Sequence, residues 1–171
     1  MDESDPQTVP LDRTYVETVL HHGREYQRYS LENGVYFAPV DEDEAYRHRL
    51  MHHVFSLLFQ NRLVFPPVSA LNRVLECGFG AGSWAIEVAE QHPECEVVGI
   101  DIYPNMLPET LPANLNLQVD DLNRRSTFPG NHFDLINSRL LAGGIHANGW
   151  RNYMADLFRI LRPGGIVPNS I

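Results

Sequence analysis

The glycine-rich segment from Val74 to Gly82, VLECGFGAG, constrains the fold of this chain more than any other feature. It has the pattern of a short buried strand that ends in a turn with glycines at positions 78, 80 and 82, and a helix pattern begins at Ser83. Glycine lets the backbone approach a ligand closely because no Cβ is in the way, and a helix start offers free N–H groups. This order predicts a site for an adenosine-type cofactor.

Strand and helix patterns alternate along the rest of the chain. Strands are predicted at 74–75, 96–101, 115–120 and 133–137, with a fifth beginning at 166–167, and helices at 83–91 and 150–161, the second closed by the RPGG of residues 162–165. Such alternation predicts an α/β fold: a Rossmann-like doubly wound parallel sheet with helices on both faces.

The segment before the sheet indicates a helical extension. Residues 1–12 have the polar composition of a flexible tail, and residues 14–29 predict one or two short helices. A longer helix is expected from the acidic run at 41–44 to about Arg62. Its apolar residues keep the three-and-four spacing of one helix face: Tyr46, Leu50, Val54, Leu57 and Leu58. We expect residues 13–70 to form a cap or lid and residues 71–171 to form the sheet domain.

Composition excludes several classes of partner. The 171 residues carry a formal net charge of −9, which predicts no nucleic-acid partner and no docking on an anionic membrane. The apolar runs are too short to span a bilayer, and the acidic start does not resemble a signal peptide. The two cysteines, Cys77 and Cys95, have no metal or disulfide spacing. An intracellular location, cytoplasm or nucleus, is therefore predicted.

Acidic residues end three of the predicted strands. Glu76 ends the first, Asp101 the second, about twenty residues after the glycines, and Asp120 with Asp121 the third. Ligands bind at this edge of open α/β sheets, and a carboxylate suits a ribose diol because it accepts two hydrogen bonds. One of the paired acids is placed to accept from an adenine amino group.

The glycine turn is compatible with two cofactors. A dinucleotide fingerprint needs a third glycine where this chain has Ser83, and Glu76 would repel a pyrophosphate. An acid before the glycines suits a cationic ligand, such as a sulfonium-bearing amino acid. An NAD-dependent oxidoreductase fragment remains an alternative, which Ser83 and Glu76 disfavour.

The motifs ECGFGAG, VVGIDI, VDDL, FDLINSR and LRPGG, in this order, resemble class I S-adenosylmethionine-dependent methyltransferases. The earlier segments HHGREYQRY, NGVYFAPVDEDE and RLMHHVFSLLFQNRL are similar to the part that precedes the core in fungal methyltransferases of the LaeA type. Members of that group act in or near secondary metabolism, as regulators or tailoring enzymes. The resemblance implies S-adenosyl-L-methionine as cofactor, and a small-molecule acceptor or a protein partner of unknown identity.

The resemblance also implies roles for residues at the methionine end of the cofactor. The glycines at 78, 80 and 82 (Gly78, Gly80 and Gly82) would wrap the methionine part, and Glu76 would position this turn and the cofactor's ammonium group. The segment Asn137, Ser138 and Arg139, after the fourth predicted strand, would border the donor methyl group.

At the adenosine end, Asp101 would bind the ribose and Ile102 would lie against the adenine. Asp121, the second member of the Asp120–Asp121 pair, would meet the adenine amino group, and Leu122 would offer its backbone N–H.

A full class I core has seven strands, whereas this chain stops in or just after the fifth. We therefore expect an incomplete core with an uncovered strand edge, which predicts poor soluble expression. A methyltransferase inactivated by truncation is one reading, and the first alternative is a noncatalytic methyltransferase-like protein that binds or regulates.

Catalytic residues are hard to assign because methyl transfer mainly requires orientation and exclusion of water. No base stands out: His146 is the best of the candidates, and His21 and His22 are weaker ones. His48 and His52 stand four residues apart on a helix but lack a third ligand, so no metal is expected. Tyr26, Tyr29 and Tyr36 either close over the cofactor or pack as ordinary aromatic residues.

Overall fold

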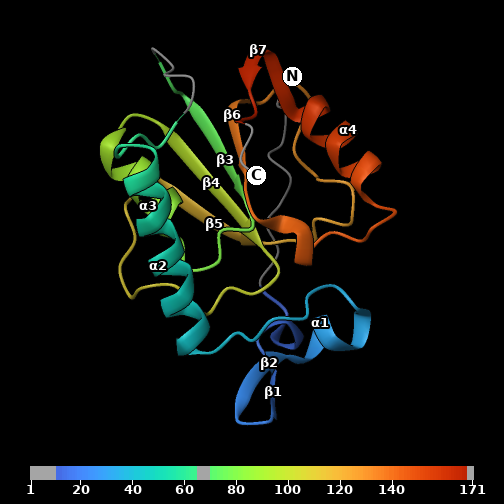
Figure 1. Cartoon of the computed structure of the whole chain (residues 1–171). Coiled ribbons are helices and arrows are strands. Elements are labelled where there is room, and N and C mark those ends of the chain that lie inside the picture. The colour runs from blue at the N-terminus through green and yellow to red at the C-terminus, as the bar shows by residue number, and fades with distance from the viewer. Residues whose placement is uncertain (1–10, 65–69, 169–171) are drawn as a thin grey trace.

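Five short strands form one parallel sheet in the order β5-β4-β3-β6-β7, and Figure 1 shows this sheet between the helices. The structure, a computed structural model, describes residues 11–64 and 70–168. The strands are β3 (Arg73–Cys77), β4 (Glu96–Asp101), β5 (Leu115–Val119), β6 (Phe133–Ser138) and β7 (Leu161–Ile166). Every neighbouring pair is parallel. The predicted α/β class is confirmed, and the carboxyl ends of the strands meet at one edge.

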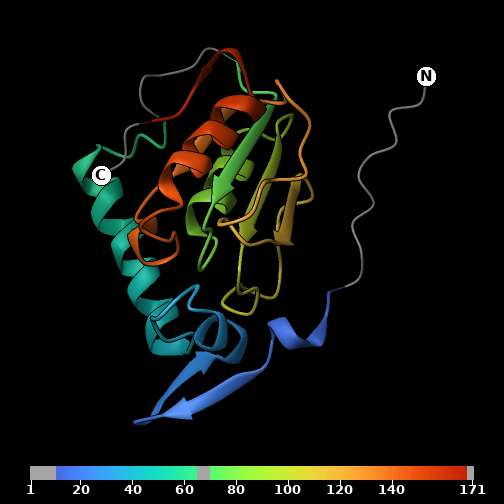
Figure 2. The same cartoon turned by 90° about the vertical axis from the view of Figure 1, so that its right-hand side faces the viewer.

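Helices cover both faces of the sheet (Figures 1 and 2). Alternate residues of a strand point to opposite faces, so Val74 packs with α3 (Ser83–Gln91) while Leu75 packs in the cluster that contains α4 (Trp150–Ile160). Both side chains are fully buried. The sheet is therefore doubly wound, as the sequence predicts.

The last strand starts earlier than predicted. Leu161 pairs with Phe133 and Ile166 pairs with Leu135, so four residues on β7 lie opposite one on β6. Gly164 has a φ of +80° within this irregular stretch. The prediction that the strand begins at Ile166 is wrong because the RPGG segment bulges between two paired positions instead of separating the helix from the strand.

The prediction of short helices over residues 14–29 is partly wrong. Strands β1 (Thr18–His21) and β2 (Arg24–Gln27) form an antiparallel hairpin, which follows a 3-10 helix at Arg13–Tyr15 and precedes α1 (Arg28–Asn33). The two turn residues, His22 and Gly23, both have positive φ, at 49° and 76°. That geometry is typical of two-residue hairpin turns. Most of the predicted tail, residues 1–10, lies outside the described residues.

Helix α2 (Glu42–Leu58) forms where predicted, although it ends four residues before Arg62. Its N-cap Asp41 accepts from the Glu44 N–H at 3.0 Å and binds the Arg24 guanidinium through two hydrogen bonds of 2.6 and 2.7 Å. The apolar stripe faces solvent, since each member is at least 49% exposed: Tyr46, Leu50, Val54, Leu57 and Leu58. The spacing correctly indicated a helix, but the face of α2 that packs against the rest of the protein is the one opposite this stripe.

The N-terminal segment is attached to the sheet through one buried glutamine. Gln27 is 1% exposed, and its Nε2 donates to the Tyr15 carbonyl at 2.7 Å and to the Ile102 carbonyl at 2.8 Å. Its Oε1 accepts from the Ser30 hydroxyl. Gln27 thus fixes the backbone directly after β4. Within the described residues, the chain has no helix with the length and apolar character needed to cross a bilayer.

We predict that Gln27→Leu lowers the free energy of unfolding by about 2–3 kcal/mol, because buried carbonyls and a hydroxyl lose their partner. Hydrogen exchange at Ile102 and Tyr103 should accelerate in the same variant. Urea denaturation and exchange mass spectrometry measure both effects. The control Leu20→Ala, at a side chain that is 74% exposed, should change the stability by less than about 0.5 kcal/mol. Unchanged exchange at Ile102 in Gln27→Leu would contradict the proposed attachment.

Candidate functional site

A cleft opens at the carboxyl ends of the strands, under the inner face of α2. Together with the open space at its mouth, the cleft contains about 1060 Å³ that no protein atom fills. The sequence-predicted residues that line it are Glu76, Gly78, Gly80, Asp101, Ile102, Asp120, Leu122 and Arg139. The described structure therefore brings most of the predicted site together. Gly82, Asp121, Asn137 and His146 do not line this cleft.

The glycine turn needs its glycines for conformation and for space. Gly78, Gly80 and Gly82 have φ values of 71°, 54° and 73°, in the left-handed region that favours glycine. A Cβ at Gly80 would overlap His48 Nδ1 on α2, and one at Gly78 would overlap Leu141. Gly82 caps the start of α3. The turn is thus a cradle with no room for side chains.

Glu76 is buried at the base of the turn, with 5% of its surface exposed. Its Oε2 accepts from the Ala85 N–H at 3.0 Å, and its Oε1 accepts from Asn137 Nδ2 at 3.3 Å. Burial raises the pKa of Glu76 to about 8, although the nearby Arg139 acts in the opposite direction. Asn137 therefore acts through Glu76, and this carboxyl group is poised to meet a cation.

Asp101 joins β4 to the glycine turn. Its Oδ2 accepts from the Gly80 N–H at 2.7 Å and its Oδ1 accepts from the Tyr103 N–H at 3.0 Å. Burial raises the pKa of Asp101, and the backbone hydrogen bonds oppose that shift. A carboxylate has about four acceptor positions, so these backbone hydrogen bonds leave acceptor capacity for a hydroxyl group in the cleft.

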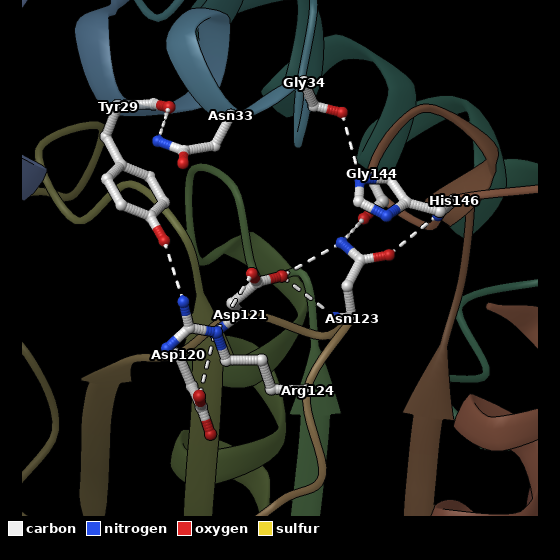
Figure 3. A network of polar contacts seen from close by, with 9 residues as sticks. All are labelled: Tyr29, Asn33, Gly34, Asp120, Asp121, Asn123, Arg124, Gly144 and His146. Carbon is white, nitrogen blue, oxygen red and sulfur yellow. Dashed lines mark hydrogen bonds and ion pairs between the residues drawn. The ribbon is translucent and has the colours of Figure 1, made fainter.

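The two acids after β5 have different environments. Asp120 lines the cleft, and burial raises the pKa of its carboxyl group. Asp121 belongs instead to the polar network of Figure 3, where its Oδ1 accepts from the backbone N–H and the side-chain amide of Asn123, both at 2.9 Å. Asp120 therefore lines the cleft, whereas Asp121 holds the loop that follows β5.

His146 belongs to the same network (Figure 3). Its backbone N–H donates to Asn123 Oδ1 at 2.7 Å, and its Nε2 lies 3.1 Å from the Gly34 carbonyl. Because a carbonyl only accepts, Nε2 carries the proton. His146 holds the end of α1 against the loop after β6, a position that does not favour its predicted role as a base.

The inner face of α2 contributes polar groups that sequence reasoning did not assign to the cleft. Glu44, whose side chain is 7% exposed, binds Arg47 at 2.7 Å and His48 at 3.3 Å. His52 Nε2 lies 2.8 Å from Glu87 on α3. Each histidine thus faces its own carboxylate, and no group of three potential metal ligands occurs among the described residues. The sequence pattern that could have located these residues is the row of charged and histidine residues on the face of α2 opposite its apolar stripe.

One of the three candidate lid tyrosines lines the cleft. Burial raises the pKa of Tyr36 to about 12, and its ring lies beside the cleft with Val35 and Val40. Tyr29 packs on Tyr15 at 4.7 Å between ring centroids, and Tyr26 is not among the lining residues. The lid interpretation is therefore compatible with Tyr36 alone.

A family model described as a methyltransferase domain matches residues 74–165. The chain belongs to this family. It is 33% identical, over 88% of its length, to the secondary metabolism regulator laeA of Coprinopsis cinerea, of which it covers 39%. It is 30% identical, over 95% of its length, to the methyltransferase pytC of Aspergillus terreus, of which it covers 49%. The chain thus spans less than half of each of these relatives.

Solved structures agree with the family assignment. A phosphoethanolamine N-methyltransferase of Haemonchus contortus, in complex with S-adenosyl-L-methionine, is 25% identical with a TM-score of 0.52, over 68% of this chain and 27% of that one. The resemblance to class I and LaeA-type methyltransferases is therefore confirmed.

We predict that Gly80→Ala weakens folding and closes the cradle, because the new Cβ meets His48 and adopts an unfavourable φ. The cost should be about 2–4 kcal/mol in urea denaturation. In the double variant Gly80→Ala/His48→Ala the overlap is removed, so about half of the loss should be recovered. Additive effects of the two substitutions would contradict the close approach of α2 to the turn.

Proposed function

We propose that this chain is the cofactor-binding part of a methyltransferase that uses S-adenosyl-L-methionine and acts in or near fungal secondary metabolism. The observation that carries this proposal is the convergence of Glu76, Asp101 and Asp120 beside one glycine turn. Family membership and similarity to the laeA and pytC proteins support it, as does a solved neighbour that holds this cofactor.

The cofactor's three parts fit three parts of the cleft. Glu76, with Gly78 and Gly80, would hold the ammonium group of the methionine part. Asp101 would accept from the ribose hydroxyls, and Ile102 would contact the adenine. In place of the Asp121 role that the family resemblance implies, Asp120 would accept from the adenine amino group, and the Leu122 backbone N–H would be its second partner.

The chemistry requires little more than orientation. When bound, S-adenosylmethionine would supply an electrophilic methyl group, which would pass to the acceptor as the sulfur–methyl bond breaks and S-adenosylhomocysteine leaves. An acceptor that is already a good nucleophile would need orientation but no base. The residues of this chain hold the sulfonium end near Glu76, and Tyr36 with the inner face of α2 excludes water from it. Exclusion of water strengthens these electrostatic contacts. The acceptor is a small molecule or a protein.

The cellular setting is part of the proposal. Cys77 and Cys95 are both buried and free, which fits a reducing compartment, so we place the protein in the cytoplasm or nucleus. The net charge of −9 supports a partner other than nucleic acid or an anionic membrane.

The direct test is calorimetric titration with S-adenosylhomocysteine and, separately, with NAD. The first should bind and the second should not, because the Glu76 carboxyl group disfavours a pyrophosphate. Asp101→Asn should lower the affinity for S-adenosylhomocysteine about 10- to 100-fold, the worth of a charge-assisted hydrogen bond. Asp121→Asn is the matched control and should change it less than about threefold. Binding of NAD alone would overturn the proposal in favour of the oxidoreductase alternative.

Cofactor affinity should depend on pH through Glu76. Burial places the pKa of this group at about 8 in the free protein, so it is protonated at lower pH, and the bound ammonium group lowers that pKa again. Binding therefore releases a proton, and affinity for S-adenosylhomocysteine should rise up to about tenfold per pH unit from about pH 6 to about pH 8. Titration in buffers of different ionisation enthalpy measures the proton release.

Glu76→Gln provides the control for this pH dependence. An acid whose pKa is higher in the folded state than in the unfolded state destabilises the fold as pH rises between the two values. In the free protein the melting temperature should therefore fall from about pH 5 to about pH 8. Glu76→Gln should weaken the binding of S-adenosylhomocysteine, and it should flatten the pH dependence of both the melting temperature and the affinity. An unchanged slope of affinity against pH in this variant would contradict the assigned role.

A further inference from the structure

A second, smaller cavity shares a wall with the cofactor cleft. It encloses about 530 Å³, again counting the mouth. Three side chains line both spaces: His52, Trp84 and Arg139. Phe55 and Phe59 line only the second cavity, and their rings stack with centroids 5.9 Å apart and planes 13° apart. The shared wall is thus part aromatic and part cationic.

Arg139 is the cation at this junction. Its guanidinium lies over the Phe55 ring, 4.6 Å from the centroid, which fixes the side chain in place. Burial lowers the pKa of Arg139, and the nearby Glu76 acts in the opposite direction. The side chain is therefore partly desolvated and held between the two cavities by contacts that use none of its N–H groups.

The guanidinium of Arg139 lacks a hydrogen-bond acceptor among residues 11–64 and 70–168. Other arginines near the cleft differ: Arg47 donates twice to Glu44, at 2.7 and 3.0 Å, and Arg24 donates twice to Asp41. Among the described residues, His52 Nδ1 is the one fully buried side-chain polar atom without a partner, so the Arg139 N–H groups are accessible to water. A ligand acceptor would replace that water beside the aromatic wall.

We propose that Arg139 binds a carboxylate group at the junction of the two cavities. The planar guanidinium matches a carboxylate through two parallel hydrogen bonds, and the aromatic wall beside it excludes water. This inference rests on the proposed function, because that function identifies the two possible sources of the carboxylate.

The first source is the cofactor, whose methionine part carries both an ammonium and a carboxylate group. Glu76 and Arg139 both line the cofactor cleft, so one acidic and one basic group are available there for the two charges of an amino-acid zwitterion. The second source is an acceptor that lies in the second cavity against Phe55 and Phe59. The rings there fit a flat aromatic acid.

Three probes separate the two sources. S-adenosylhomocysteine carries the amino-acid carboxylate, 5′-methylthioadenosine lacks it, and benzoate stands for an aromatic acid. Each is titrated calorimetrically into the wild-type chain, Arg139→Met and Arg139→Lys, with the melting temperature recorded for every variant. Arg151→Met, at an exposed residue of α4, is the control for the loss of one positive charge.

If the cofactor is the source, Arg139→Met should lower the affinity for S-adenosylhomocysteine at least about tenfold, while the affinity for 5′-methylthioadenosine stays unchanged. If the acceptor is the source, Arg139→Met should abolish saturable binding of benzoate and leave S-adenosylhomocysteine unaffected. In either case Arg139→Lys, which keeps the charge but loses the planar guanidinium, should lower the affinity for the carboxylate probe by less than Arg139→Met does. If Arg139→Met does not fold, the lysine variant provides the test.

Wild-type affinities for both carboxylate probes in the two Arg139 variants would overturn the inference while leaving the proposed function intact. Failure of the wild-type chain to bind S-adenosylhomocysteine would instead overturn the proposed function, and the benzoate titrations would still decide whether Arg139 binds a carboxylate.

Discussion

The hydrogen bond from the Gly80 N–H to the Asp101 carboxylate organises the candidate site. It joins the glycine turn after β3 to the end of β4 at 2.7 Å. Glu76 provides the second attachment, because it accepts from the Ala85 N–H at the start of α3. The buried carboxyl group of Glu76 and the partly buried one of Asp101 therefore hold the turn open without filling it. The remaining acceptor positions of these groups point to the same conclusion as the family match: the cleft takes an adenosine linked to a cation.

The buried and partly buried carboxyl groups of the site lower the stability of the free protein and favour the binding of a cationic ligand. Burial raises the pKa values of Glu76 and Asp101, so the free protein holds two carboxyl groups in surroundings that disfavour their charged forms. Strained or desolvated groups of this kind are typical of functional sites. A cationic ligand removes part of the cost at Glu76, which is why the site is expected to become more stable when the cofactor is bound.

The N-terminal segment is part of the site as well as a cover for it. Helix α2 turns a mixed face inward, on which His48 lies over Gly80 and Phe55 lines the second cavity, and it exposes its apolar stripe. Gln27 fixes the backbone that follows Asp101. Tyr36 lines the cleft from the loop between α1 and α2. A cofactor-binding unit consisting of the sheet alone would therefore lack one wall.

Sequence reasoning located the strands and the glycine turn because buried strands have continuous apolar residues and glycines mark the turn. It missed the hairpin because the turn signal is one glycine after His22. The residues alone left Asp120 and Asp121 open and the family resemblance favoured Asp121, because adjacent side chains point in different directions and only the local backbone decides which one lines the cleft. The face that α2 buries was equally undetermined, because a spacing of three and four identifies a stripe without identifying its partner.

The most direct test of this account is a crystal structure of the chain with S-adenosylhomocysteine. The account predicts electron density for the ligand over Gly78 and Gly80, with the ribose hydroxyls within about 3 Å of Asp101 and the amino group beside Glu76. Density for the ligand at another surface, with the glycine turn and Asp101 left in contact only with each other, would contradict it.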